Sequence, residues 1–243
     1  MTAADRGRSP WRRLTSGPTG RFTPWKFNWL ANHKLLAALR RVRGHAHGDL
    51  LDIGCGSMPF APVFQGRVRR YWGSDLRASR YAGDARPVAY ATAEAQPFRD
   101  GSFDTVLGLS LLTYLPEPGR LLAEAHRMLR PGGTLLLEFT QMVPLHDAPH
   151  DYFRFTRFGA EYLLRQAGFE PVEVVPIGGL SARVGLSTIA ALARWNRGPT
   201  RVLTEIPVRI LYVVLQLLFE LLDWLLFDPN EVLAHIVVAK KRG

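Results

Sequence analysis

The chain has 243 residues, of which 47% are hydrophobic and 21% charged, and its formal net charge is +10. This composition excludes a disordered chain and supplies enough apolar residues for a full core, so one globular domain with appendages is expected. The single cysteine, Cys55, excludes an intramolecular disulfide and a zinc-cysteine cluster, and it favours a reducing, cytoplasmic compartment.

The positive charge is concentrated near the N-terminus. Residues 1–48 contain ten arginines and lysines against one aspartate, so they carry nine net positive charges. Such a segment suits an anionic surface, either lipid headgroups or nucleic acid, and it equally fits a solvated tail. Residues 1–24 are rich in proline and glycine, which predicts a flexible basic leader. They contain no apolar run with a small-residue cleavage site, which argues against a secretory signal.

Residues 25–243 are predicted to form one domain. Apolar spacing predicts a helix over 25–43, and short apolar runs then alternate with helical patterns. Strands are expected at 50–53, 69–74, 87–91, 103–109, 134–139, 169–176 and 232–239. Helices are expected at 118–129 and at 156–167, the second with Thr156 as N-cap and Gly168 just past its end. The alternation predicts a doubly wound α/β fold with a mainly parallel sheet.

A long insertion, residues about 178–230, separates the last two expected strands. Residues 181–195 fit a short amphipathic helix, and residues 208–227 are apolar except for four polar residues that share one helical stripe, Arg209, Gln216, Glu220 and Asp223. Three arrangements are open for this second helix. It packs on the sheet or a partner subunit, it lies in a membrane interface with the polar stripe toward water, or it crosses the bilayer. Crossing is opposed by the two acids, which cost about 2.5–3.5 kcal/mol each near the membrane centre.

A glycine turn follows the first expected strand. Gly54-Cys55-Gly56 lets the backbone approach a ligand, and Asp52 lies just before it. Pro59 stands where a dinucleotide fingerprint has its third glycine. Since a carboxylate repels a pyrophosphate but not a sulfonium or an ammonium group, the turn favours S-adenosylmethionine. Cys55 is interpreted as a small packed residue because no base accompanies it in the sequence.

Asp75 ends the second expected strand, about 20 residues after the glycine turn, where doubly wound folds place a carboxylate that binds ribose hydroxyls. Five motifs now stand in order: Leu51-Asp52-Ile53-Gly54-Cys55-Gly56, Ser74-Asp75, Ala93-Glu94-Ala95-Gln96-Pro97-Phe98, Gly101-Ser102-Phe103-Asp104-Thr105-Val106 and Leu129-Arg130-Pro131-Gly132-Gly133-Thr134. Together they resemble the class I S-adenosylmethionine-dependent methyltransferases, a family with many small-molecule, lipid and glycan methyltransferases. The resemblance covers about residues 48–178 and resumes at the final strand.

The resemblance implies a seven-stranded sheet whose last strand is antiparallel. It places Gly54 and Gly56 against the methionine part of S-adenosylmethionine and Asp75 on the ribose. Thr92 stands where relatives often have an aspartate for adenine, so adenine binding is expected from the backbone near Ala93 or from Glu94. The predicted cofactor-binding residues are Asp52, Gly54, Cys55, Gly56, Asp75, Leu76, Thr92, Ala93, Glu94 and Ser110, the last because ligands bind beyond the carboxyl ends of strands.

The loop after the fifth strand, residues 146–156, is both polar and aromatic. It resembles an H-x-x-P-x-D-Y-x-R-x-T pattern found in a subset of these methyltransferases. This resemblance implies His146 as the base, Asp151 as its orienter or a substrate ligand, and Arg154 as an acceptor contact. Alternatively, Asp151 and Arg154 form a local ion pair that caps the next helix.

Tyr114, after the fourth strand, is expected to line the acceptor pocket, and His150 and Tyr152 are expected substrate contacts. His126 and His235 are interpreted as structural. The predicted catalytic residues are therefore His146, Asp151 and Tyr114.

Three functions are compatible with these residues. The first is methyl transfer to an oxygen or nitrogen of a small-molecule, lipid-linked or glycan acceptor, at an anionic membrane surface because of the basic leader and the apolar insertion. The second is RNA methylation. It is disfavoured because Gly108-Leu109-Ser110-Leu111 stands where such enzymes often carry an Asn-Pro-Pro-Tyr-type tetrapeptide, and no nucleic-acid module is present. The third is a non-catalytic scaffold that retains the fold. The oligomeric state is left open.

Overall fold

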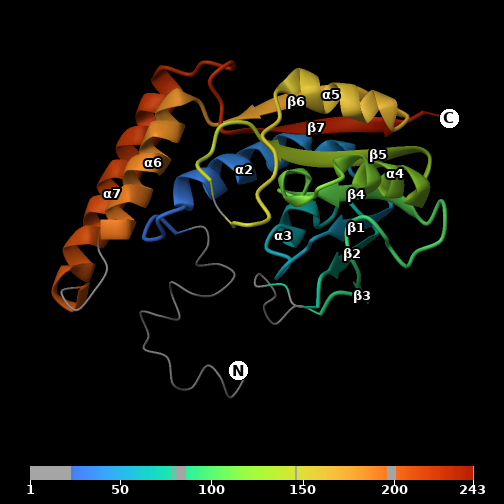
Figure 1. Ribbon diagram of the computed structural model, residues 1–243, viewed down its shortest axis with the longest axis horizontal. Coiled ribbons are helices and arrows are strands. Elements are labelled where there is room, and N and C mark those ends of the chain that lie inside the picture. Colours follow the sequence, from blue (N-terminus) through green and yellow to red (C-terminus); the bar gives the residue numbers. More distant parts are fainter. Residues whose placement is uncertain (1–22, 78, 80–85, 146, 196–200, 243) are drawn as a thin grey trace. The chain divides into compact units, whose positions relative to one another are not determined.

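The computed structural model describes residues 23–77, 79, 86–145, 147–195 and 201–242 (Figure 1). The leader expected over 1–24 therefore falls almost entirely outside the described residues. The chain divides into two compact units: the larger comprises residues 37–177 and 234–243, and the smaller draws on residues 1–36 and 178–233. The boundary at 178 coincides with the expected start of the insertion.

The larger unit contains a seven-stranded sheet in the order β3-β2-β1-β4-β5-β7-β6. The strands are β1 (Asp49–Ile53), β2 (Arg70–Asp75), β3 (Ala89–Tyr90), β4 (Phe103–Gly108), β5 (Leu129–Thr140), β6 (Phe169–Ile177) and β7 (Ala234–Lys241). β7 pairs antiparallel with β5 and β6, and the other neighbours pair in parallel. The predicted doubly wound fold with an antiparallel last strand is confirmed.

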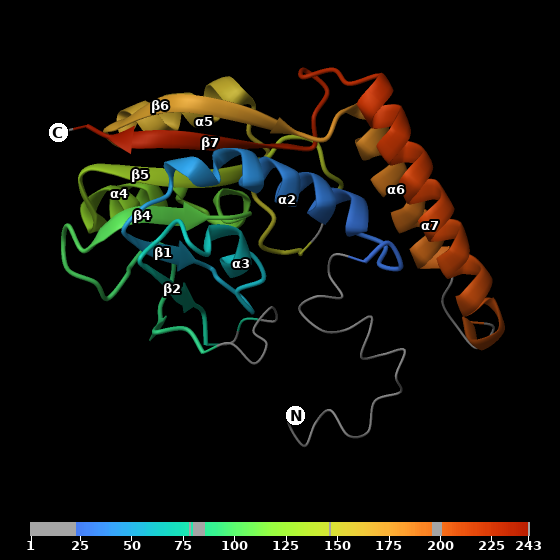
Figure 2. The ribbon, with the colours of Figure 1, turned by 180° about the vertical axis from the view of Figure 1, so that it is seen from behind.

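Helices cover both faces of this sheet. α4 (Pro118–Met128) and α5 (Arg157–Gln166) lie on one face, and α3 (Ala61–Phe64) with the later part of α2 (Trp29–Val42) lies on the other (Figures 1 and 2). All five residues of β1 are buried, as expected for a central parallel strand covered on both sides. α5 begins after Thr156, whose hydroxyl accepts a hydrogen bond from the Gly159 N–H, so the expected N-cap is confirmed.

The register of the central strands brings their carboxyl ends together. Ile53 at the end of β1 pairs with Ser74 of β2 and with Gly108 of β4. Asp75 pairs with Tyr90 at the end of β3. The residues that follow these strands therefore meet at one edge of the sheet, which is where ligands bind in doubly wound folds.

Two strands differ from the predicted lengths by more than one residue. β3 has two residues rather than five, because Pro87 cannot donate to the ladder of this edge strand. β5 begins at Leu129, which pairs with Phe103 across a register shift, rather than at 134. The intervening prolyl-glycyl stretch has the composition of a turn, so its inclusion in the strand was not predicted.

The smaller unit contains α6 (Leu180–Trp195) and α7 (Arg201–Leu225), which lie side by side (Figures 1 and 2). α6 confirms the helix expected at 181–195, whereas α7 begins seven residues before the expected start and continues through Pro207. Among the residues that the model describes, no helix has the length and apolar character needed to cross a membrane.

Two of the four residues in the polar stripe of α7, Gln216 and Asp223, face the protein interior rather than water, which differs from the expected interfacial arrangement. Gln216 and Asp223 are only 0% and 1% exposed. Gln216 Oε1 accepts a hydrogen bond from the Leu30 N–H at 3.0 Å, and its amide nitrogen donates to the Pro24 carbonyl at 2.6 Å. Main-chain groups elsewhere in the smaller unit satisfy these side chains, and the apolar positions of α7 are left exposed.

Candidate active site

The glycine turn after β1 presents main-chain atoms without side chains at Gly54 and Gly56. Gly54 and Gly56 have φ values of 69° and 52°, a conformation that glycine adopts without strain. The Gly54 and Cys55 N–H groups donate to the Ser74 carbonyl at 2.8 and 3.1 Å, which fixes the turn against β2. A Cβ atom on Gly54 would lie 2.6 Å from Leu111 Cδ2, so this position has no room for a side chain.

Asp75 lies beside this turn at the end of β2 and is half-buried. Its Oδ2 accepts a hydrogen bond from the Gly56 N–H at 2.8 Å, and its Oδ1 accepts one from the Leu76 N–H at 2.7 Å. Each carboxylate oxygen keeps a second lone pair, so two adjacent acceptors remain for a pair of hydroxyls. Two adjacent acceptors match the two hydroxyl donors of a ribose diol.

Asp52 and Cys55 lie in a more enclosed environment. Asp52 is buried, accepts a hydrogen bond from the Tyr71 hydroxyl at 2.7 Å, and has its pKa raised by burial to about 7. Direct contact between Asp52 and a cofactor stays a prediction. Cys55 is also buried, and burial raises the pKa of its thiol to about 12. The interpretation of Cys55 as a packed residue rather than a nucleophile is confirmed.

The residues expected near adenine follow β3. Thr92 and Ala95 form an isolated antiparallel bridge, and the Thr92 carbonyl accepts hydrogen bonds from the Ala95 N–H at 3.2 Å and from Gln96 Nε2 at 2.7 Å. Ala93 and Glu94 are half-buried in this short loop. The compact loop is held by its own main chain, and its contact with adenine stays a prediction.

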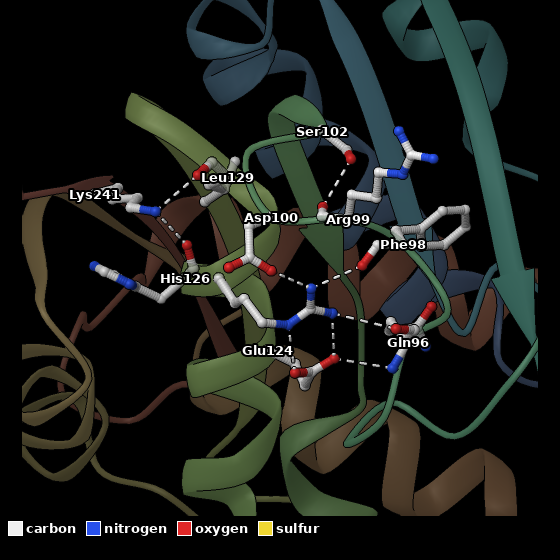
Figure 3. Close-up of polar contacts among 10 residues, drawn as sticks. Gln96, Phe98, Arg99, Asp100, Ser102, Glu124, His126, Leu129 and Lys241 are labelled. Carbon is white, nitrogen blue, oxygen red and sulfur yellow. Dashed lines mark hydrogen bonds and ion pairs between the residues drawn. The ribbon is translucent and has the colours of Figure 1, made fainter.

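A shallow hollow of about 540 Å³ lies beside this loop, and it is lined by Tyr90, Ala91, Glu94, Ala95, Gln96, Pro97, Glu124 and Arg127. It includes neither the glycine turn nor Asp75. The Arg127 guanidinium donates to Glu124 and Asp100 and to the Phe98 carbonyl, in the network of Figure 3. Glu124 and Arg127 of this lining are thus paired with each other.

Ser110 follows β4 in a left-handed conformation with a φ of 55°. Its N–H and its hydroxyl both donate to Glu138 Oε2, at 2.6 and 2.7 Å. Glu138 is a buried residue of β5 that was not among the predicted site residues. The signal for it was present in the sequence, since one acid interrupts the apolar run at residues 135–139 of this strand.

The loops after β4 and β5 are joined beside this edge of the sheet. The Tyr152 and Phe153 N–H groups donate to the Thr113 carbonyl at 3.0 and 3.3 Å. The hydroxyls of Thr113 and Thr140 lie 2.5 Å apart. Tyr114 ends the short 3-10 helix that carries Thr113, so it belongs to the same loop assembly.

Asp151 and Arg154 form an ion pair within the loop after β5. Two guanidinium nitrogens of Arg154 lie 2.5 and 2.7 Å from the two carboxylate oxygens of Asp151, whose side chain is fully buried. Arg154 also donates to the carbonyls of Val143 and Pro144 at 3.2 and 3.3 Å. The geometry fits the ion-pair interpretation, although the helix cap is Thr156 and not Asp151.

The remaining acceptor-side residues are aromatic. His150 Nδ1 lies 3.4 Å from the Tyr152 hydroxyl, and the rings of Tyr152 and Phe153 follow one another at 6.4 Å between centroids. Both of these rings are exposed. His146, the predicted base, lies outside the described residues.

Two histidines were interpreted as structural, and their surroundings confirm it. His235 is buried in β7 and stacks on Phe139 with 5.5 Å between ring centroids. Burial lowers the pKa of His235 to about 4. His126 packs edge-on against Phe169 at 5.3 Å.

The sequence of the chain is similar to those of known methyltransferases. Residues 51–137 match the family model described as a methyltransferase domain. The chain is 28% identical over 161 residues to a ubiquinone biosynthesis O-methyltransferase of Pseudomonas aeruginosa strain UCBPP-PA14. The match covers 61% of this chain and 62% of that protein, so it spans less than two thirds of the relative's length.

Solved structures share the fold. The [4+2]-cyclase SpnF superposes with a TM-score of 0.57 at 22% identity, covering 86% of this chain and 81% of that one. A phosphoethanolamine N-methyltransferase of Haemonchus contortus, solved with S-adenosyl-L-methionine, gives a TM-score of 0.55 at 16% identity over 98% of this chain and 61% of that one. The sheet order, the ordered motifs and the family match agree.

Residues 51–137 thus carry a methyltransferase domain, and the chain has the fold of the class I S-adenosylmethionine-dependent methyltransferases. S-adenosyl-L-methionine is the cofactor of this family, and the described residues of the methyltransferase fit it. The glycine turn has no room for side chains at Gly54. Among the described residues, Asp75 Oδ1 and Oδ2 each accept a main-chain hydrogen bond, and the second lone pair on each can accept from a diol. The fold, family and cofactor predictions are thereby confirmed, whereas the roles of individual residues stay predictions.

Proposed function

We propose that this methyltransferase transfers a methyl group from S-adenosylmethionine to an oxygen or nitrogen atom of a small-molecule, lipid-linked or glycan acceptor, at a membrane surface. One observation carries the proposal. The aromatic loop after β5 is hydrogen-bonded to the loop after β4, at the sheet edge that also carries the glycine turn and Asp75. An acceptor held by these loops lies next to the cofactor, as an in-line displacement requires.

The cofactor supplies a methyl group activated by a positively charged sulfur. In this proposal the glycine turn admits the methionine part, and Asp75 accepts hydrogen bonds from the ribose hydroxyls. Ser110 is held in its strained conformation by Glu138 and forms part of the wall between cofactor and acceptor. Thr92, Ala93 and Glu94 contact the adenine.

On the acceptor side, Tyr114, His150 and Tyr152 contact the methyl acceptor. The exposed aromatic rings of the loop favour an acceptor with a planar or apolar part. Arg154 fixes the loop through Asp151 and two carbonyls rather than meeting the acceptor itself. His146 removes the proton that a hydroxyl acceptor must lose.

The names of two similar proteins support oxygen and nitrogen as the atoms that receive the methyl group. One is an O-methyltransferase of ubiquinone biosynthesis, and the other is a phosphoethanolamine N-methyltransferase. The exposed apolar face of α7 supports an amphiphilic acceptor.

The test is methyl transfer from radiolabelled S-adenosylmethionine to a panel of acceptors: a soluble catechol, a prenylated phenol, an aminoalcohol, a glycolipid and an RNA transcript. We expect labelling of one of the first four classes. Tyr152→Ala should lower kcat/KM for that acceptor by about tenfold or more, a loss of about 1.4 kcal/mol of transition-state stabilisation, with unchanged cofactor affinity. Tyr162→Ala, an exposed aromatic residue of α5, is the matched control. Labelling of RNA alone, or of no acceptor by a folded, cofactor-binding protein, would contradict the proposal.

A further inference from the structure

The outward side of α7 is apolar along its whole described length. Nine of its described hydrophobic side chains are between 41% and 74% exposed: Ile206, Ile210, Leu211, Val214, Leu217, Leu218, Leu221, Trp224 and Leu225. Their spacing of three and four residues forms one stripe, about 30 Å long at 1.5 Å per residue. We call this set the apolar stripe. Monomeric proteins rarely expose so continuous a surface without a binding role.

Buried polar contacts fix which side of α7 faces outward. Asp223 Oδ1 accepts hydrogen bonds from the Gly179 N–H at 2.8 Å and the Ala182 N–H at 3.0 Å. Lys34 Nζ lies 2.9 Å from Asp223 Oδ2 and 3.1 Å from a carboxylate oxygen of Glu220. Rotating the helix to hide the stripe would leave these groups buried without partners, which is costly. The exposure of the stripe is therefore built into the smaller unit.

We propose that the apolar stripe binds in the interfacial region of an anionic lipid bilayer, with α7 lying in the membrane plane. The proposal rests on the proposed function at a membrane surface and names the part of the chain that makes the contact. A protein partner would bring a polar rim with about one hydrogen bond per 100–200 Å², and the side chains of the stripe offer only the Trp224 indole N–H. Acyl chains require no such groups, and tryptophan prefers the headgroup level.

Charge favours anionic over neutral lipid. The apolar stripe contains no acid, and the described acids of α7 are engaged by cations: Glu205 by Arg209 at 2.6 Å, and Glu220 and Asp223 by Lys34. Nine net positive charges are concentrated in residues 1–48. Basic residues near an anionic surface are attracted to it, and salt screens this attraction. The apolar contact and the attraction to anionic headgroups thus act together.

The experiment is flotation of the full chain with two kinds of vesicle, phosphatidylcholine alone and phosphatidylcholine mixed with phosphatidylglycerol in equal parts. Wild type should float with the anionic vesicles, and added salt should weaken this preference. The double variant Leu217→Ser with Leu221→Ser should lower the partition coefficient by more than about tenfold, since two exposed leucines of the stripe lose their contact with acyl chains. Phe158→Ser, which changes a more exposed apolar residue of α5, should float like wild type.

Thermal melting shows that each variant is folded, and sedimentation measures the oligomeric state. Flotation of the double variant like wild type would overturn the proposal. It would also be overturned if wild type forms a dimer that the double variant loses while neither binds vesicles, since a second copy of the chain would then cover the stripe. Cofactor binding is measured in the same samples. A wild type that floats but does not bind S-adenosylmethionine would contradict the proposed function, whereas the proposal that the apolar stripe binds lipid would still hold.

Discussion

Two aspartates near the glycine turn have different surroundings, and these assign them different roles. Asp52 is buried under the Tyr71 hydroxyl, and burial raises its pKa to about 7. Asp75 is half-buried and is oriented by two main-chain N–H groups. Each oxygen of a carboxylate held in this way has a second lone pair that can accept from a hydroxyl. Ribose binding by Asp75 therefore stays the prediction, whereas Asp52 joins β1 to β2 through the Tyr71 hydroxyl.

The pH dependence of stability provides a test at a single residue. Burial lowers the pKa of His235 from 6.5 to about 4. Between these two pH values the unfolded chain binds a proton at this residue that the folded chain does not, so the free energy of unfolding decreases as the pH falls. One proton contributes at most about 1.4 kcal/mol per pH unit. His235→Gln should reduce this slope in urea denaturation between about pH 6.5 and 4. An unchanged slope would show that His235 is not buried in its neutral form.

At the scale of elements, Arg127 ties α4 to the loop between β3 and β4 (Figure 3). Its guanidinium donates to the carboxylates of Glu124 and Asp100 and to the carbonyls of Gln96 and Phe98, at distances from 2.7 to 3.2 Å. The loop begins at the residues expected near adenine and ends before β4. Arg127 thus stabilises the path of the chain from the cofactor edge back into the sheet.

Arg127→Gln should lower the free energy of unfolding by about 1–3 kcal/mol, because two carbonyls and two carboxylates lose a shared donor. Arg127 is about one third exposed, so solvent screening keeps the loss within this range. Arg99 is an exposed arginine of the same loop, and Arg99→Gln should change the free energy of unfolding by no more than about 0.5 kcal/mol. Chemical denaturation of the two variants measures the difference. Equal losses would contradict the assigned role.

The positions of helices and strands could be predicted from the sequence more accurately than the side that each helix turns toward water. Buried parallel strands are nearly continuous apolar runs, so β1 and β4 were placed to within a residue or two. The stripe on α7 was recognised, but periodicity does not show which side of a helix faces water. Gln216 and Asp223 face inward because their partners are main-chain groups far away in the sequence, at Leu30 and Gly179. Such long-range contacts leave no local pattern.

The same limit applies to the site. Gly54 and Asp75 could be predicted because their roles need a fixed residue type at a fixed position after a strand. Glu138 was missed because its partner, Ser110, belongs to another strand end. The pairing of Asp151 with Arg154 had been left open, since spacing of three residues fits both a local ion pair and two separate substrate contacts.

At the scale of the whole molecule, cofactor chemistry and lipid contact are assigned to different units. Every predicted cofactor residue belongs to the larger unit, and the apolar stripe belongs to the smaller one. Substitutions in the stripe should therefore leave cofactor affinity unchanged, and substitutions at the glycine turn should leave vesicle binding unchanged. This separation allows the two proposals to be tested independently.

Calorimetric titration of S-adenosylmethionine into the full chain tests the central claim most directly. We predict micromolar binding to wild type and a loss of at least about tenfold in Asp75→Ala, about 1.4 kcal/mol. Asp75→Asn keeps one acceptor oxygen, so its affinity for S-adenosylmethionine should lie between those of wild type and Asp75→Ala. Glu170→Ala on β6 removes an acid at the far edge of the sheet and should bind like wild type. Absence of binding to the folded wild type, or equal binding to Asp75→Ala, would contradict the assignment of the cofactor site.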